Sequence, residues 1–130
     1  MVRADPAMRH RLKAEVYLSE ALTRCRRINL VELEADILLA WAQWHREREE
    51  GEEAKESAEE ALSIADRGHY RLKQADIHNF LAQWELDRGS LAPAQQHAEI
   101  AKGSALCDGP PHYYKAALDE AERLLQLAEQ

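Results

Sequence analysis

The chain has 130 residues, about the size of one domain, and 45% of them are hydrophobic while 32% are charged. Ala (22 residues), Leu (17) and Glu (17) dominate, whereas Val, Ile and Thr together number nine, too few β-branched residues for a sheet protein. The formal net charge of −7 argues against non-specific binding to nucleic acids and against binding to an anionic membrane surface.

Helical periodicity, together with the Gly and Pro residues between apolar segments, predicts six helices. Their expected bounds are 6–27, 30–50, 52–67, 70–88, 91–106 and 111–129. We expect Gly51 to end the second helix, Gly68 to be the left-handed cap of the third, and Gly89 to close the fourth. Because short links join these amphipathic helices, neighbouring helices should be antiparallel.

The sequence repeats itself at an interval of 40 residues. Comparison of 20–46 with 60–86 gives ten identities in 27 positions, including the triplets Ala-Asp-Ile and Ala-Gln-Trp. A weaker third copy follows at an offset of 43, which aligns Tyr70 and Asp76 with Tyr113 and Asp119. The pattern predicts a half-repeat helix (6–27), two repeats (30–67 and 70–106) and a C-terminal helix (111–129). Such hairpins bury their apolar faces by stacking on one another, as in an α-solenoid.

The stretch that begins with Leu81-Ala82 and continues with Gly89, Leu91, Ala94, Ala98 and Ala101 resembles the tetratricopeptide repeat. That family places small residues where its two helices cross and a Gly near the turn between them. In the first copy, Trp41-Ala42 precede Gly51 by two residues more than Leu81-Ala82 precede Gly89. The interval of 40 residues is closer to the interval of HEAT-like repeats than to that of tetratricopeptide repeats, which is about 34 residues. The placement of Ala and Gly nevertheless favours the tetratricopeptide repeat.

A second resemblance covers residues 65–125. The strings at 65–78 and 107–115 are similar to the C-terminal repeats of bacterial signalling proteins of the NACHT or NB-ARC kind. In such proteins the repeats follow an NTPase module and act as sensor or scaffold. The chain has no GxxxxGK[ST] phosphate loop, so we expect it to correspond to the repeat part alone.

The tetratricopeptide resemblance implies that the first helix of each pair lines a concave groove. We expect residues at equivalent positions of each copy to line the groove. They are Asp76, Asn79, Gln83 and Asp87 in the second copy, Asp36, Leu39, Gln43 and Glu47 in the first copy, and Asp119, Glu122 and Gln126 in the third copy. Such a surface would be polar and acidic and would suit a basic or amide-rich peptide segment. Alternatively, Asp36 and Asp76 are structural residues that accept hydrogen bonds from a neighbouring helix.

Other features of the sequence have ordinary structural explanations. The six histidines lack metal-ligand spacing, and His78 and His97 are the pair most expected to be close. Trp44 and Trp84 could form an aromatic platform for a ligand, although their repeated placement favours a core between repeats. No nucleophile stands beside a base, and we expect neither a metal nor a cofactor.

The two cysteines, Cys25 and Cys107, are far apart, and we expect both to be reduced in a cytoplasmic protein. No apolar run is long enough to span a membrane, and the first residues lack the apolar core of a signal peptide. The chain opens directly into a helical pattern, as a piece of a longer protein would.

The expected function is a non-enzymatic protein–protein interaction module, a scaffold or sensor in a bacterial regulatory protein. The alternative is a homo-oligomer formed through apolar faces at the ends of the array, because repeat arrays expose apolar surface unless capped. A small enzyme with an acidic active site is a third and weaker interpretation.

Overall fold

The computed structural model of the chain describes residues 6–28, 30–106 and 114–129, with side chains from residue 12 onward. All secondary structure in these ranges is helical. The helices are α1 (Pro6–Ile28), α2 (Val31–Glu47), α3 (Gly51–Gly68), α4 (Arg71–Asp87), α5 (Leu91–Leu106) and α6 (Lys115–Ala128). The predicted all-α class is confirmed, while Cys107 and the turn at 107–113 lie outside the described residues.

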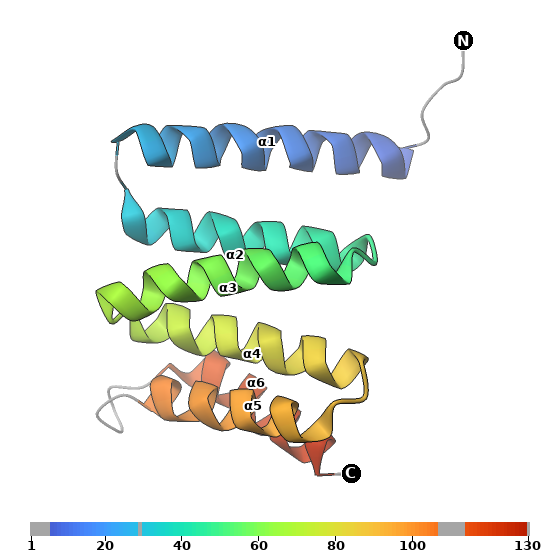
Figure 1. Ribbon diagram of the computed structural model, residues 1–130, viewed down its shortest axis with the longest axis vertical. Helices are drawn as coiled ribbons and strands as arrows, with labels where there is room; N and C mark the ends of the chain where they lie inside the picture. The colour runs from blue at the N-terminus through green and yellow to red at the C-terminus, as the bar shows by residue number, and fades with distance from the viewer. Residues whose placement is uncertain (1–5, 29, 107–113, 130) are drawn as a thin grey trace.

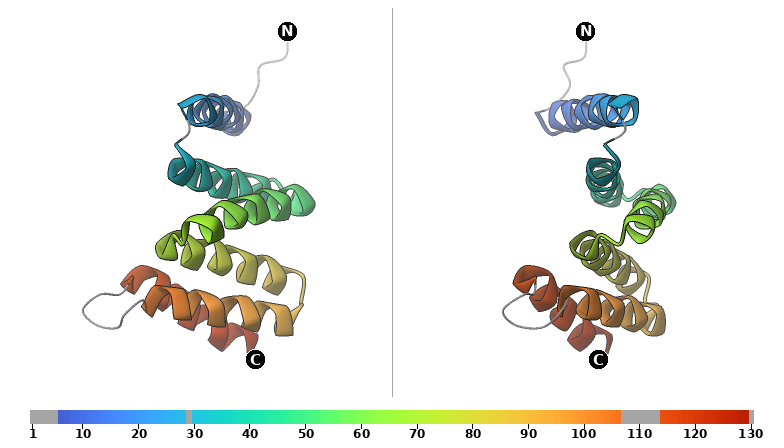
Figure 2. Two further views of the ribbon diagram at one scale, coloured as in Figure 1. Left: turned by 60° about the vertical axis from the view of Figure 1, so that its left-hand side comes forward. Right: turned by 90° about the vertical axis from the view of Figure 1, so that its left-hand side faces the viewer.

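The helices from α1 to α5 stack in chain order, and α6 lies beside α5 rather than beyond it, as Figure 1 shows. The two tightest pairs are α2 with α3 and α4 with α5, and α6 packs against both α5 and α4. Two further views show α3 displaced to one side of α2 and α4, so the chain advances in a zigzag (Figure 2). This packing of neighbouring helices is consistent with a helical repeat.

Alanines allow the paired helices to approach closely. Ala54, Ala58 and Ala61 of α3 are fully buried, and α5 carries buried alanines at the same three positions, 40 residues later. The larger residues of α2 and α4, such as Leu38 and Phe80, belong to the same core. Packing large side chains against small ones fills the space between helices without voids, which is how the core excludes water.

Turn hydrogen bonds establish the repeat interval of 40 in three dimensions. The amide of Leu30 donates to the carbonyl of Cys25, and the amide of Tyr70 donates in the same way to Ala65, both at 3.0 Å. Directly before α6 the corresponding donor is Tyr114, whose amide bonds to the carbonyl of Ala105 at 2.8 Å. Because Tyr114 corresponds to Tyr70, the third copy has an offset of 44, and the predicted offset of 43 is wrong by one residue.

The left-handed turn residues also differ from prediction. Glu49 has φ 61° and lies 40 residues before Gly89, which has φ 76°. Gly51 is the first residue of α3 and does not end α2. The counterpart of Gly89 is therefore Glu49, and Trp41 precedes Glu49 by the same number of residues as Leu81 precedes Gly89, so the two-residue discrepancy disappears. Gly68 remains helical, and His69 takes the left-handed conformation with φ 55°.

A glycine at position 49 should stabilise the fold, because a side chain in the left-handed region costs about 1–2 kcal/mol. After allowing for the greater freedom of glycine in the unfolded chain, we expect Glu49→Gly to raise the free energy of unfolding by about 0.5–1 kcal/mol. Urea denaturation measures the change. Gly89→Ala, at the equivalent turn, should lower the same free energy by about 1 kcal/mol, and a loss of stability in both variants would contradict the assignment.

Candidate partner-binding groove

One groove, of about 520 Å³, is formed jointly by α2, α4 and α6. Its lining residues are Leu39, Gln43, Arg46, Asp76, Asn79, Phe80, Gln83, Ala116, Ala117, Glu120 and Arg123. Five of the groove residues expected from the sequence therefore meet on one surface: Leu39, Gln43, Asp76, Asn79 and Gln83. Phe80 and Leu39 supply an apolar part between these polar side chains.

The one-residue change of register moves the expected residues of α6 away from this surface. Glu120 and Arg123 line the groove, whereas Asp119 and Glu122 are not among its lining residues. At an offset of 44, Asp119 and Glu122 correspond to Ala75 and His78, which in α4 face α5. Asp119 and Glu122 are therefore exposed on the outer face of α6, where Asp119 forms an ion pair with Lys115 at 3.7 Å.

A chain of hydrogen bonds crosses the groove and links its three helices. The Asp87 carboxylate accepts from Arg46 Nε and from Gln83 Nε2, both at 2.9 Å. The Gln83 Oε1 atom in turn accepts from Arg123 Nη2 at 3.2 Å, and Arg123 is ion-paired with Glu120 at 2.6 Å. Partial burial favours a higher pKa for Asp87, but the bonds from Arg46 and Gln83 outweigh it and lower that pKa.

Sequence analysis did not identify Arg46 and Arg123, the two cations of this chain of bonds. With the correct offset of 44, Arg123 corresponds to Asn79 and would have been placed on the groove face. Arg46 precedes its partner Asp87 by 41 residues, one more than the repeat interval, so an alignment of identical residues does not reveal the pair.

Asn79 forms a hydrogen bond that links α4 to α6 beside the groove. It is 6% exposed, and its Nδ2 donates to the carbonyl of Ala117 at 3.0 Å. Its Oδ1 is buried and has no hydrogen-bond partner among the described residues. Among the described residues, the Asn79 side chain therefore forms a hydrogen bond through Nδ2 alone. Its unpaired buried acceptor is energetically unfavourable.

The two aspartates of the repeated Ala-Asp-Ile triplet have different surroundings. Lys73 of α4 reaches back to α2, where its Nζ lies 3.4 Å from Asp36 and 3.2 Å from Glu32. Asp36 is thus held as the structural interpretation predicts, and it borders a neighbouring cleft rather than the groove. Partial burial, and then the charge of Asp36, raises the pKa of Asp76, although Lys73 opposes this.

His78 and His97 are in contact, as predicted, with their Nδ1 atoms 3.0 Å apart. Burial, and then the neighbouring His97, lowers the pKa of His78 to about 4, and burial also lowers the pKa of His97. The pair is therefore neutral at pH 7, with one ring donating to the other. Within the described ranges, no three His, Cys, Asp or Glu side chains gather in a way that could hold a metal ion.

Comparisons of the chain with protein-family models, with curated proteins and with solved structures find no match. None of the helices in the described ranges is long and apolar enough to cross a membrane. The groove must therefore be interpreted from its own geometry and from the internal repeat.

The histidine pair predicts a specific dependence of stability on pH. The unfolded chain, with a histidine pKa near 6.5, binds more protons than the folded chain between about pH 6.5 and pH 4, so acid in this range favours unfolding. Replacing the pair by its counterparts in the first copy (His78→Leu with His97→Ser, after Leu38 and Ser57) should remove about 2 kcal/mol of that loss.

Denaturant titrations at a series of pH values measure the effect as the difference between wild type and the double variant. The exposed His69 supplies the control, because His69→Asn retains a residue that tolerates the left-handed conformation and should leave the pH dependence unchanged. Identical pH profiles for wild type and the double variant would show that the pair is not buried in its neutral form.

Proposed function

We propose that the chain is a tetratricopeptide-like α-solenoid that acts as a non-enzymatic protein–protein interaction module. The observation that carries this proposal is that the first helices of successive pairs, α2, α4 and α6, line one groove. Residues of the repeated sequence, Gln43 and Gln83, lie in it 40 residues apart. A surface built from equivalent positions on successive helices can follow an extended segment over several residues.

The chemistry of the groove favours a segment that carries at least one basic residue. Asp76 has no ion-pair partner among the described residues, so its carboxylate is available to a Lys or Arg side chain. The amide of Gln43 can pair with the backbone of an extended peptide, and Phe80 offers an apolar contact. Arg46 and Arg123 are already paired with Asp87 and Glu120, which reduces their attraction for an acidic partner.

The strings at 65–78 and 107–115 support a place for this module in a bacterial cytoplasmic regulatory protein, through their resemblance to repeats of NACHT or NB-ARC signalling proteins. In that setting the module is a scaffold or sensor, and any catalytic step belongs to another domain. In this proposal the chain binds a protein or peptide and uses no nucleic acid, metal or cofactor.

A second candidate function is self-association through α1. Leu12, Val16 and Tyr17 are 51%, 57% and 79% exposed on this helix. The opposite end of the array is different, because the outer face of α6 carries Asp119 and Glu122. In the described part of the chain, α1 thus exposes more apolar side chains than α6, where Leu127 is 39% exposed, and this difference favours a closed dimer through α1 over an open filament.

A library of random displayed peptides, selected on the wild-type protein, tests the groove directly. We expect enrichment of sequences containing Lys or Arg, with dissociation constants of about 1–100 μM, typical of short peptide segments. The double variant Asp76→Lys with Gln83→Ala should bind the selected peptides at least about tenfold more weakly, since it reverses the charge and breaks the hydrogen-bond chain.

The matched control carries Glu56→Lys with Gln96→Ala, which likewise reverses one negative charge and removes one amide, at exposed positions of α3 and α5 outside the groove-lining residues. It should bind like wild type. Equal binding by wild type and the groove variant would refute the proposed site.

Self-association is tested by light scattering over a range of protein concentrations. If α1 forms the contact, the wild-type mass should rise with concentration, and Leu12→Ser with Val16→Ser should keep the protein monomeric. A wild-type mass that stays constant at high concentration would exclude this candidate, and a rise that persists unchanged in the variant would place the contact elsewhere.

A further inference from the structure

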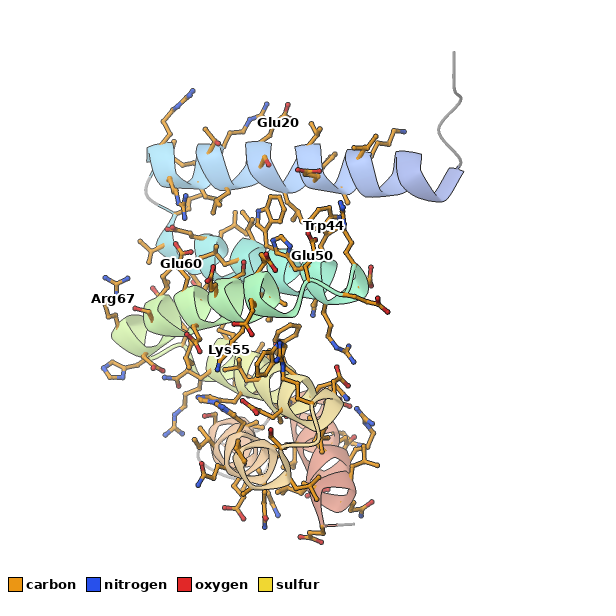
Figure 3. The ribbon with its side chains drawn as sticks, turned by 45° about the vertical axis from the view of Figure 1, so that its right-hand side comes forward. Glu20, Trp44, Glu50, Lys55, Glu60 and Arg67 are labelled. Carbon is orange, nitrogen blue, oxygen red and sulfur yellow. The ribbon has the colours of Figure 1, made fainter. Side chains whose placement is uncertain are left out.

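A second cleft lies on the face of α2 opposite to the groove, between α1 and α3. It has a volume of about 580 Å³, and the side chains of Trp41, Trp44 and His45 form its aromatic floor. Figure 3 shows Trp44 projecting into the space between α1 and α2, with Glu50 beside it. The two indole rings meet edge to face with centroids 5.3 Å apart, and the imidazole of His45 stacks on Trp41 at 5.5 Å. We call this site the tryptophan cleft.

The second copy of the repeat shows what fills the equivalent space. The cleft residues Leu38 and Ser57 correspond to His78 and His97, whose rings lie against each other with centroids 5.2 Å apart. The first copy has a small hydroxymethyl side chain at position 57, where the second copy has an imidazole. The absence of that ring from the first copy opens the tryptophan cleft beside Trp41.

The indole N–H groups provide a second contrast between the copies. Trp84 is buried and donates from Nε1 to the carbonyl of Gly51 at 2.8 Å. The Nε1 atoms of Trp41 and Trp44 are also buried but have no acceptor among the described residues. Buried donors without a partner are unfavourable, so a molecule that brings an acceptor to this floor gains from it.

The side chain of Arg48 lies over part of this floor. The guanidinium of Arg48 lies 4.6 Å from the centre of the Trp44 ring, and its side chain is 36% exposed. Its ion pair with Glu50 is near the surface and contributes little to stability, so Arg48 can move aside at little cost.

The charges at the rim of the cleft are mostly paired within the protein. Arg26 is held by Glu34 and Glu60, each at 3.0 Å. Glu50 accepts from both Arg48 at 3.3 Å and His45 at 3.2 Å. Glu15 adds a carboxylate with no cation partner in the described part of the chain, so the rim repels anions. An uncharged occupant fits this balance, because it brings no charge that competes with these ion pairs.

We propose that the tryptophan cleft binds a small, uncharged, planar aromatic molecule that carries a hydrogen-bond acceptor. Its ring occupies the space that the His97 imidazole fills in the second copy, and it lies against the indoles of Trp41 and Trp44. A cleft of this size is in the range of small-molecule sites, about 300–1,000 Å³. This site is separate from the groove and does not depend on the proposed peptide binding.

Benzimidazole, which is uncharged near neutral pH and has a ring-nitrogen acceptor, is a suitable probe for nuclear magnetic resonance of the isotope-labelled protein. The three tryptophan Nε1–H signals report the site, with Trp84 as an internal reference. We expect millimolar benzimidazole to shift the Trp41 and Trp44 signals and to leave the Trp84 signal in place. Indole has the same ring size but lacks the acceptor, so it should bind more weakly.

Two substitutions of Ser57 distinguish specific binding in the cleft from non-specific binding to apolar surface. Ser57→His restores the ring of the second copy and should weaken benzimidazole binding by about tenfold or more, whereas Ser57→Ala keeps the cleft open and should bind like wild type. The Trp84 signal and the helical circular dichroism report whether each variant folds, and Ser57→Val serves as a smaller plug if the histidine variant does not.

Three results would overturn the proposal. They are the absence of any shift at millimolar benzimidazole, equal shifts of all three tryptophans, and unchanged binding by the folded plug variant.

Discussion

The close crossing of helices over buried alanines is the constraint on which the rest of the structure depends. Ala54, Ala58 and Ala61 have no exposed surface, so a larger side chain at any of them would push α3 away from α2. Because the same small residues recur in α5, α4 and α5 meet in the same geometry. The two equal steps bring α2, α4 and α6 side by side, and the groove exists only because of that regularity.

The internal repeat made most of the fold predictable. Ten identities at an interval of 40 indicated which helices are equivalent, and the predicted helix order and the small residues at the helix crossings agreed with the structure. The errors in the predicted fold concerned the residues at which helices end and turns begin. The sequence predicts helix ends at Gly51 and Gly68, but the left-handed residues are Glu49 and His69. A non-glycine residue can be held in that conformation when the helices on both sides determine the turn.

The groove was predictable for α2 and α4 and not for α6. Two tyrosines, Tyr113 and Tyr114, stand next to each other, and a weak alignment cannot decide which one matches Tyr70. The choice matters because one residue turns a helix by about 100°, which carries Asp119 from the groove face to the outer face. The hydrogen bond from Tyr114 to Ala105 settles the match, and no property of the sequence alone contains it.

The outer face of α6 limits how the array can grow. Asp119, Glu122 and Gln126 occupy the positions that Ala75, His78 and Ala82 use in α4 to receive α5. A further helix laid on α6 in the same manner would have to bury two carboxylates and an amide, and desolvating unpaired charges is strongly unfavourable. Lengthening the array by an engineered hairpin would therefore first require alanine or leucine at these three sites.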